Sequence, residues 1–181
     1  MASSAHKTEE EKKEYFDPPE VLEEKVETLA HWIQEASHFI AFTGAGISTS
    51  CGIPDFRSGY NTVLPTGPGA WEKRKVQRPS KKNTKVQMSK AIPSPTHMAF
   101  VKLVQEGLLK FLASQNVDGL HRKSGIPPEN LSELHGNTNL EKCKKCTKEY
   151  MRDFRVRTSS SVHKHETGRN CDDPRCRGKL K

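Results

Sequence analysis

Four of the five cysteines form two pairs whose spacing is typical of a metal site. The four are Cys143, Cys146, Cys171 and Cys176. Two residues lie within the first pair, four within the second, and 24 between the pairs. Two turn-borne pairs of thiolates supply the closed tetrahedral shell that zinc takes in structural sites. We therefore predict one structural zinc ion, with His163 or His165 as the alternative to one cysteine.

Three further polar motifs follow short apolar segments. They are Gly44-Ala45-Gly46-Ile47-Ser48, Gln115-Asn116-Val117-Asp118 and His135-Gly136-Asn137. In the first motif the glycines let a ligand approach the backbone, and the amides that follow can point at a pyrophosphate. A plain turn between a strand and a helix is the alternative, because the full Gly-x-Gly-x-x-Gly spacing is absent. The other two motifs offer an amide, a carboxylate and an imidazole for hydrogen bonding and proton transfer.

The elements that must position these motifs follow the order of an α/β fold. Apolar residues at helical spacing predict a helix that starts near Pro19 and ends about Ala36, and a second helix after Thr96. Short apolar runs predict three buried strands, at 38–43, 109–117 and 131–134. The proline-rich region 59–95 is predicted to be mostly loop. In a parallel sheet, ligands gather at the carboxyl ends of the strands, so we expect the three motifs to meet at one edge.

The composition excludes several classes of protein. The chain has 181 residues, a net charge of +8 and 33% apolar residues, which suits one domain with room for two subdomains. No apolar run approaches the roughly 18 residues of a membrane helix, and the charged N-terminus lacks the apolar region of a secretory signal. The odd number of cysteines argues against a disulfide framework, and we expect Cys51 to be a small packing residue. We therefore expect a protein that is neither membrane-spanning nor secreted.

Two segments carry the excess positive charge. Residues 72–90 contain eight basic and one acidic side chain, and residues 141–181 contain thirteen and six. This clustering indicates contact with a polyanion such as nucleic acid. A solvated loop or a nuclear-import signal is the alternative for the first segment, because no aromatic residues interleave to stack on bases. Its run of basic residues is Lys73, Arg74, Lys75, Arg78, Lys81, Lys82 and Lys85.

These patterns predict three regions. Residues 1–17 are acidic and poor in apolar side chains, so we expect a flexible arm. Residues 18–140 are expected to form an α/β domain with a parallel sheet, and 59–95 to be a basic loop region within it. Residues 141–181 are expected to form a zinc-binding module, to which the metal contributes folding energy. The predicted fold class is α/β, a parallel sheet with a small zinc-binding module.

The ordered motifs resemble those of the sirtuin (Sir2) family. The residues that carry the resemblance are Gly44 to Ser48, Gly52 to Ser58, Pro95-Thr96-His97, Ser114 to His121, Glu133 to Asn137 and the paired cysteines. The short loop between Arg57 and Pro95 and the segment 167–171 resemble the nuclear, chromatin-associated, class IV-like branch. Members of this family are NAD-dependent protein deacylases. The resemblance therefore implies NAD and one zinc ion as cofactors, a nuclear location, and acyl-lysine substrates such as histones. It also implies a partial Rossmann-like parallel sheet, with 18–140 as the N-terminal part of a Rossmann-like NAD-binding domain and 59–95 as its basic cofactor or substrate loop region. Contact with nucleic acid is predicted from the basic segments.

The resemblance also implies a reaction and the residues that perform it. Nicotinamide is released from NAD and the acyl group passes from lysine to ADP-ribose, with ADP-ribosyl transfer as an additional activity. The implied catalytic residues are His135, which as general base takes a proton from a ribose hydroxyl, and Asn116. Asn116 and Asp118 would line the nicotinamide pocket, with Gln115 at the ribose. The full set of implied cofactor-binding residues is Gly44, Ala45, Gly46, Ser48, Asp55, Phe56, Arg57, Gln115, Asn116, Asp118 and His135.

Four side chains near these motifs have expected supporting roles. Phe56 is expected to form an apolar lid over the reacting ribose. Arg57 is expected to contact a phosphate or the ribose, and a surface salt bridge is its alternative role. His97 and His121 are expected to hold loops in place by hydrogen bonds rather than to take part in catalysis.

The chain also departs from the family's pattern. It ends at Lys181, five residues after Cys176. The family continues with strands that complete the dinucleotide fold, among them a Gly-Thr-Ser turn that holds the adenosine half of NAD. We therefore expect an apolar edge and face of the sheet to be exposed. Two hypotheses follow: a deacylase whose encoded form is longer, or a truncated, catalytically impaired fragment that acts as a zinc-stabilised chromatin- or partner-binding protein.

Overall fold

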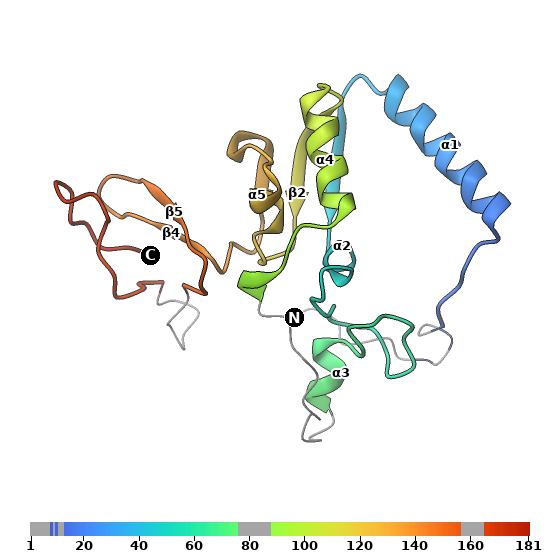
Figure 1. Ribbon diagram of the computed structural model, residues 1–181, viewed down its shortest axis with the longest axis horizontal. Helices are drawn as coiled ribbons and strands as arrows, with labels where there is room; N and C mark the ends of the chain where they lie inside the picture. The colour runs from blue at the N-terminus through green and yellow to red at the C-terminus, as the bar shows by residue number, and fades with distance from the viewer. Residues whose placement is uncertain (1–7, 9, 11–12, 76–87, 157–164) are drawn as a thin grey trace.

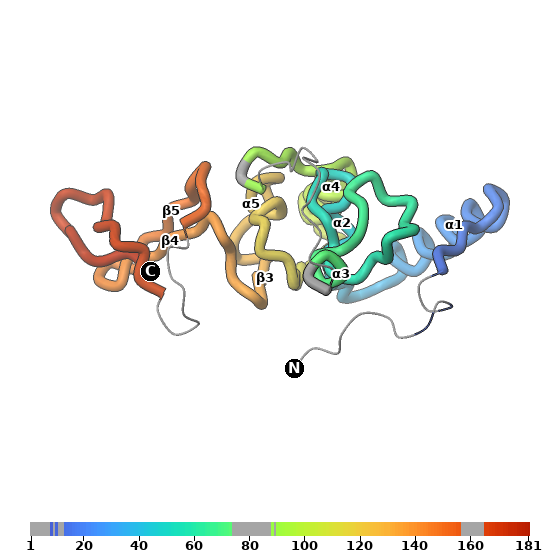
Figure 2. The backbone as a smooth tube through the Cα atoms, turned by 90° about the horizontal axis from the view of Figure 1, so that it is seen from below, coloured from blue at the N-terminus to red at the C-terminus, as the bar shows by residue number. Residues whose placement is uncertain are grey.

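Three structural parts follow one another along the long axis of the molecule. The computed structural model describes residues 8, 10, 13–75, 88–156 and 165–181. Figure 1 shows helix α1 at one end, a parallel sheet with its helices in the middle, and a small region with strands β4 and β5 at the other end. The view from below in Figure 2 shows the same order.

The central sheet is parallel and has three strands. They are β1 (Phe39–Thr43), β2 (Leu109–Ser114) and β3 (Leu131–Glu133), in the order β1-β2-β3. The last residues of the strands are in register, because Thr43 pairs with Ser114 and Ser114 pairs with Glu133. All three strands therefore end level at the same edge. The predicted α/β class with a parallel sheet is confirmed.

Seven short helical segments connect and cover the strands. In chain order they are α1 (Pro19–Glu35), α2 (Gly46–Thr49), α3 (Ala70–Lys75), η1 (Met88–Lys90), α4 (Pro95–Gln105), α5 (Leu120–Ser124) and η2 (Pro128–Asn130), counted over the described ranges. Helix α4 begins at Pro95 after an N-cap serine, Ser94, whose hydroxyl accepts a hydrogen bond from the His97 amide. A proline in the first turn and a serine cap are the usual start signals of a helix.

The main hydrophobic core lies between helix α4 and the sheet. Val101 of the helix packs with Leu109 and Leu112 of β2, and the last two are almost fully buried. Leu131 of β3 and Ile126 complete the cluster. Strand β2 is central, but only part of it is covered, because Lys110 and Phe111 of the same strand are exposed.

The small region at the C-terminal end is a separate antiparallel unit. Strands β4 (Leu140–Lys142) and β5 (Glu149–Met151) form its hairpin. The chain returns to this hairpin through an isolated bridge between Cys143 and Leu180, and Leu180 packs fully buried against the cysteines. The completely buried carboxylate of Glu141 accepts hydrogen bonds from two guanidinium groups, those of Arg152 and Arg169, both at 2.7 Å. These charge-assisted hydrogen bonds stabilise the unit, whose apolar core is small.

Helix α1 stands apart from the rest of the molecule (Figure 1). None of its residues is buried, and Leu22, Val26 and Leu29 are each more than half exposed. Ile40 and Phe42 of the edge strand β1 are also exposed. The expectation of an exposed apolar edge and face agrees with this arrangement. No helix among the described residues has the length and apolarity needed to cross a membrane.

One detail of the predicted elements is corrected. The second strand ends at Ser114 rather than at residue 117, because the Ser114 hydroxyl accepts a hydrogen bond from the Asn116 amide and draws the backbone out of the ladder. The region 59–95 was predicted to be mostly loop, and its described part contains two short helical segments, α3 and η1.

The basic run and the arm are only partly described. Lys73, Arg74 and Lys75 belong to α3. Arg78, Lys81, Lys82 and Lys85 lie outside the described residues, as does His163. In the arm, the carboxylate of Glu14 accepts hydrogen bonds from the Thr62 hydroxyl at 2.6 Å and the Val63 amide at 3.0 Å.

The buried position of Leu112 yields a test of the core. Replacing Leu112 by Ala leaves a cavity beneath α4, so we expect the free energy of unfolding to fall by about 3 kcal/mol. Leu22→Ala, the same change on the exposed face of α1, should cost less than about 0.5 kcal/mol. Urea unfolding followed by circular dichroism measures both, and equal losses would contradict the placement of the core.

Candidate functional site

The three polar motifs meet at the edge where the strands end. Beyond the ladder, the Gln115 amide donates to the Thr43 carbonyl at 3.0 Å, and the Leu134 amide donates to the Ser114 carbonyl at 2.9 Å. Each segment is thus bonded to its neighbour at the point where it leaves the sheet. The structure places the Gly44 turn, the segment 115–118 and the His135 turn side by side.

A buried polar cluster lies between the first two motifs. The Asn116 side-chain amide donates to the Gly44 carbonyl at 2.9 Å and to the Ser48 hydroxyl at 3.2 Å. The Ser48 hydroxyl donates to the Asp118 carboxylate at 2.7 Å. The second carboxylate oxygen of Asp118 accepts from the Leu120 amide, which fixes its orientation at the start of α5. The structure therefore brings together Ser48, Asn116 and Asp118, which lie up to 70 residues apart in the chain.

His135 is exposed at the same edge, on the turn after β3. Its Nδ1 lies 2.9 Å from the Gln115 carbonyl oxygen. A carbonyl oxygen can only accept a hydrogen bond, so Nδ1 carries the hydrogen, and no residue in the described ranges bonds to Nε2. Gly136 makes the turn possible, since it adopts a positive φ of 77°. The local backbone thus presents an imidazole with its basic nitrogen available.

The glycine turn leaves open space beside its backbone. No described atom lies within 4 Å of a Cβ built on Gly44 or Gly46. Packing within the described protein therefore does not require glycine at either position. A ligand that approaches the backbone closely would require it. Short helix α2 begins here, at Gly46.

The loop that holds Asp55, Phe56 and Arg57 is closed by contacts within itself. The Asp55 carboxylate accepts hydrogen bonds from the amide and hydroxyl of Ser58, so its oxygens are engaged in the turn. A Cβ on Gly69 would overlap the backbone of Phe56, which explains the glycine at that position. The two ends of the loop therefore lie against each other. This contact fixes the backbone from which the exposed side chains of Phe56 and Arg57 extend.

Trp71 is a residue of this loop that the sequence analysis missed. Its ring lies 5.5 Å from the ring of Phe56, and the Arg57 guanidinium lies 5.0 Å from the Trp71 centroid. Cation–π and tilted aromatic contacts of this kind are stabilising. A single tryptophan in a proline-rich region has no periodic pattern that would have identified it.

Two buried histidines support the site from beneath, as predicted. His97 is fully buried, and its Nδ1 accepts from the Ser94 amide at 3.2 Å. His121 Nε2 lies 2.9 Å from the Thr43 hydroxyl, so it ties α5 to the end of β1. The two rings are 4.9 Å apart. Burial and the neighbouring His97 lower the pKa of His121 to about 4, and burial also lowers the pKa of His97.

The four paired cysteines lie together at the end of the β4–β5 hairpin. All four sulfur atoms are within 4.8 Å of one another. The Cys143–Cys176 and Cys146–Cys171 sulfur pairs are each 3.6 Å apart, too far for a disulfide bond of about 2.05 Å. Zn–S bonds of about 2.3 Å in a tetrahedron put sulfur atoms about 3.8 Å apart. The cluster therefore fits a structural zinc ion with four sulfur ligands, without His165.

Two backbone amides support the thiolate form of Cys143. The amides of Cys146 and Lys145 point at the Cys143 sulfur, at 3.4 and 3.3 Å, and they lower the pKa of Cys143 to about 6. The Tyr150 hydroxyl lies 3.0 Å from the Cys171 sulfur. Hydrogen bonds to metal-bound sulfur orient the ligands. The fifth cysteine, Cys51, packs against Ile53 and Leu120 and lies outside the cluster.

The family of the chain follows from comparison with known proteins. Residues 44–181 match the model of the Sir2 family. This match covers most of the chain and includes the three motifs and all four clustered cysteines. The chain belongs to the Sir2 family.

Curated relatives are similar over most of the chain. It is 50% identical over 171 residues to the NAD-dependent protein deacetylase SRT1 of Arabidopsis thaliana, and 40% identical over 162 residues to the NAD-dependent protein deacetylase sirtuin-7 of Homo sapiens. The alignments cover 93% and 87% of this chain but 33% and 37% of the relatives. The chain thus spans little more than a third of the length of these relatives.

Solved structures share the fold. A Sir2 homologue in complex with ADP-ribose matches with a TM-score of 0.52 and 27% identity, over 86% of this chain and 61% of that one. A complex of Sir2 with a deacetylated p53 peptide and 3'-O-acetyl ADP-ribose matches with a TM-score of 0.51 and 26% identity, over 86% and 63%.

The geometry of the cysteine cluster predicts one zinc ion per chain. Cys171→Ser removes a buried ligand, so we expect the purified variant to lose stoichiometric zinc and the folding energy that the metal supplies. Cys51→Ser should keep the zinc, because Cys51 does not belong to the cluster. Elemental analysis of the dialysed proteins measures both. Full zinc content in Cys171→Ser would contradict the four-sulfur site.

The low pKa of His121 predicts how stability depends on pH. In the unfolded chain His121 binds a proton below about pH 6.5, whereas in the folded protein it does so only near pH 4. Acid therefore favours unfolding. We expect this residue to lower the free energy of unfolding by about 2 kcal/mol between pH 7 and pH 5.

Variants isolate the contribution of His121. In His121→Asn the fall in the free energy of unfolding between pH 7 and pH 5 should be about 2 kcal/mol smaller than in the parent protein. The exposed His31→Asn on α1 should keep the full dependence. Urea titrations at several pH values measure the slope. An unchanged slope in His121→Asn would show that the buried ring does not cause it.

Proposed function

We propose that this chain carries the nicotinamide-proximal part of an NAD-dependent protein-lysine deacylase. The observation that carries the proposal is the meeting of the Gly44 turn, Asn116 and His135 at one edge of the sheet, with the Nε2 of His135 free. Membership of the Sir2 family and relatives described as NAD-dependent protein deacetylases support it. NAD, when bound, supplies a nicotinamide leaving group and the ADP-ribose that accepts the acyl group.

His135 is the proposed general base. The Gln115 carbonyl holds the hydrogen on Nδ1, so Nε2 can take a proton from a ribose hydroxyl without a change of tautomer. The exposed turn leaves room for a substrate on the same side. A preset tautomer and orientation lower the cost of reaching the transition state.

The buried cluster of Asn116, Asp118 and Ser48 is the proposed nicotinamide pocket. Its amide and hydroxyl groups are already oriented by each other, so they do not have to reorganise when a carboxamide binds. Gln115, the residue before Asn116, is proposed to contact the ribose. Asn116 is proposed as the second catalytic residue because its side chain also bonds to the Gly44 carbonyl, next to the phosphate-binding turn.

The first motif and the loop after it are proposed to hold a phosphate and the ribose of NAD. Gly44, Ala45 and Gly46 fit a phosphate because the space beside the two glycines is open. Phe56 is exposed and supported by Trp71, so it can cover the ribose and exclude water. Arg57, held over the same tryptophan, contacts a phosphate or the ribose. Asp55 acts by shaping this loop through Ser58.

We also propose the finer assignments that the sequence suggests. The region 18–140 forms the N-terminal part of the NAD-binding domain, 59–95 its cofactor and substrate loop, 141–181 the zinc module, and 1–17 an acidic arm. The basic segments at 72–90 and 141–181 support a nuclear location, histone or other nuclear acyl-lysine substrates, and contact with nucleic acid. ADP-ribosyl transfer is a second proposed reaction of the same site.

Release of nicotinamide tests this function. The zinc-loaded chain is incubated with NAD and an acetyl-lysine peptide, and free nicotinamide is measured by chromatography. His135→Ala removes the proposed base, so we expect the rate to fall by at least about a hundredfold. His38→Ala, at the opposite end of β1, should leave the rate unchanged.

The assay also separates the two hypotheses for this chain. Equal rates for His135→Ala and the parent protein would rule out His135 as the base. Soluble, zinc-loaded protein that releases no nicotinamide would instead support a zinc-stabilised binding protein without catalytic activity.

A further inference from the structure

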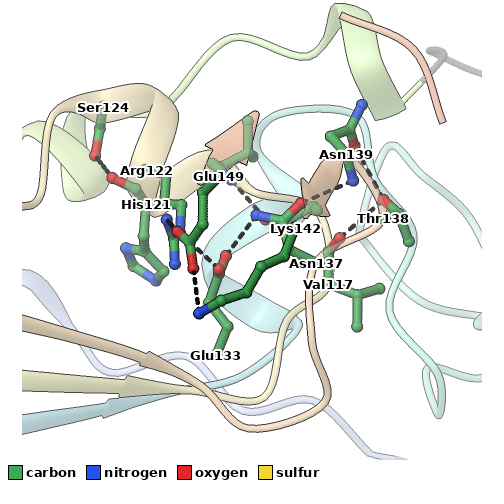
Figure 3. A network of polar contacts seen from close by, with 12 residues as sticks. Val117, His121, Arg122, Ser124, Glu133, Asn137, Thr138, Asn139, Lys142 and Glu149 are labelled. Atoms are coloured by element: carbon green, nitrogen blue, oxygen red, sulfur yellow. Dashed lines mark hydrogen bonds and ion pairs between the residues drawn. The ribbon is translucent and has the colours of Figure 1, made fainter. Parts of the chain in front are cut away.

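Arg122 bridges two carboxylates that belong to different parts of the molecule. Its Nε donates to Glu133 at 2.8 Å, and its Nη1 donates to Glu149 at 3.0 Å (Figure 3). The Arg122 side chain is only 19% exposed, and the Glu133 side chain is 7% exposed. Arg122 comes from α5, Glu133 from the end of β3, and Glu149 from β5 beside the cysteine cluster. The planar fork of arginine can hold two carboxylates at once.

On one side, this bridge holds the turn that carries His135. Glu133 accepts from Arg122 with one carboxylate oxygen and from the Asn137 side chain with the other, at 2.7 Å. Glu133 and Asn137 are therefore bonded to each other across the turn of residues 134–136, whose middle residue is His135. We call this bonded turn the bracket. A Cβ on Gly119 would lie 3.0 Å from the Asn137 amide nitrogen, so α5 packs tightly against the same bracket.

On the other side, the bridge reaches the base of the first cysteine pair. Glu149 pairs with Lys142 across the β4–β5 hairpin, where the two side chains approach to 3.4 Å. Cys143 follows Lys142 directly, and the Cys143 amide donates to the Lys148 carbonyl at 2.9 Å. Glu149, which Arg122 contacts, thus helps to close the hairpin that carries Cys143 and Cys146.

We propose that Arg122 is a positioning residue that couples the zinc-bound hairpin to the turn of His135. A metal bound by the cysteines holds the hairpin closed and keeps Glu149 against Arg122. Arg122 then holds Glu133, and Glu133 holds the bracket around His135. Such coupling acts equally in both directions, so loosening the bridge also loosens the metal. The proposal rests on the assignment of His135 as the base, but its test does not require catalysis.

Glu149→Gln cuts the bridge at its more exposed end without removing a buried group. We expect two results in the zinc-loaded protein. The ring Cε1–Hε1 resonance of His135, identified by its absence from His135→Ala, should shift and broaden in an NMR spectrum. Zinc transfer to a colorimetric chelator should be about two- to fivefold faster, as expected for the loss of one partly exposed ion pair.

Two further variants make the test specific. Arg122→Lys keeps the charge but cannot bond to both carboxylates in the same geometry, so it should change both readouts in the same direction as Glu149→Gln. Glu106→Gln is the matched control, since Glu106 pairs with Lys102 at the exposed end of α4 and belongs neither to the bridge nor to the cysteine unit. It should leave the His135 resonance and the zinc transfer rate as they are in the parent protein.

Two outcomes would overturn the proposal. In one, Glu149→Gln and Arg122→Lys behave like Glu106→Gln in both readouts. In the other, zinc transfer is faster but the His135 resonance does not move, which would limit Arg122 to stabilising the hairpin. Neither readout involves NAD or turnover. Failure of the proposed function would therefore appear separately, as absence of nicotinamide release with the coupling intact.

Discussion

The level ending of three parallel strands is the constraint on which the candidate site depends. Thr43, Ser114 and Glu133 stand side by side in the register, so the chain leaves the sheet at one edge in all three places. Beyond that edge the backbone has no ladder partner, and the segments bond to each other instead. A shift of β2 by one residue would turn its side chains to the opposite face and separate Asn116 from Ser48. The core beneath α4 opposes such a shift, because it buries Leu109 and Leu112 from one face of β2.

Local patterns were sufficient to predict the elements of the sheet and the convergence of the motifs. Apolar runs indicate buried strands, and in a parallel sheet their carboxyl ends share an edge. The end of β2 was predicted three residues too late, because the capture of the Asn116 amide by the Ser114 hydroxyl does not depend on hydropathy. The cysteine spacing predicted four metal ligands and left His163 and His165 open as alternatives to one of them. The distances between the four sulfur atoms removed that ambiguity.

Contacts between distant parts of the chain could not be predicted in this way. Trp71 supports Phe56 and Arg57 only because the two ends of a long loop close on each other, and a lone aromatic residue carries no period. Arg122 and Glu149 are 27 residues apart, and their contact depends on how the cysteine-bearing hairpin lies against α5. Their charges alone would suit a solvated surface equally well. The sequence therefore identifies the groups that can do chemistry, whereas the packing between units determines which residues hold them.

We propose that the three strand ends form one binding surface for the nicotinamide half of NAD. Backbone amide NMR spectra recorded during a titration of the zinc-loaded chain with NAD test this claim most directly. The account predicts that residues 44–48, 115–118 and 135–136 shift together, with one common saturation curve. Shifts confined to the basic segments, or to only one of these turns, would contradict it.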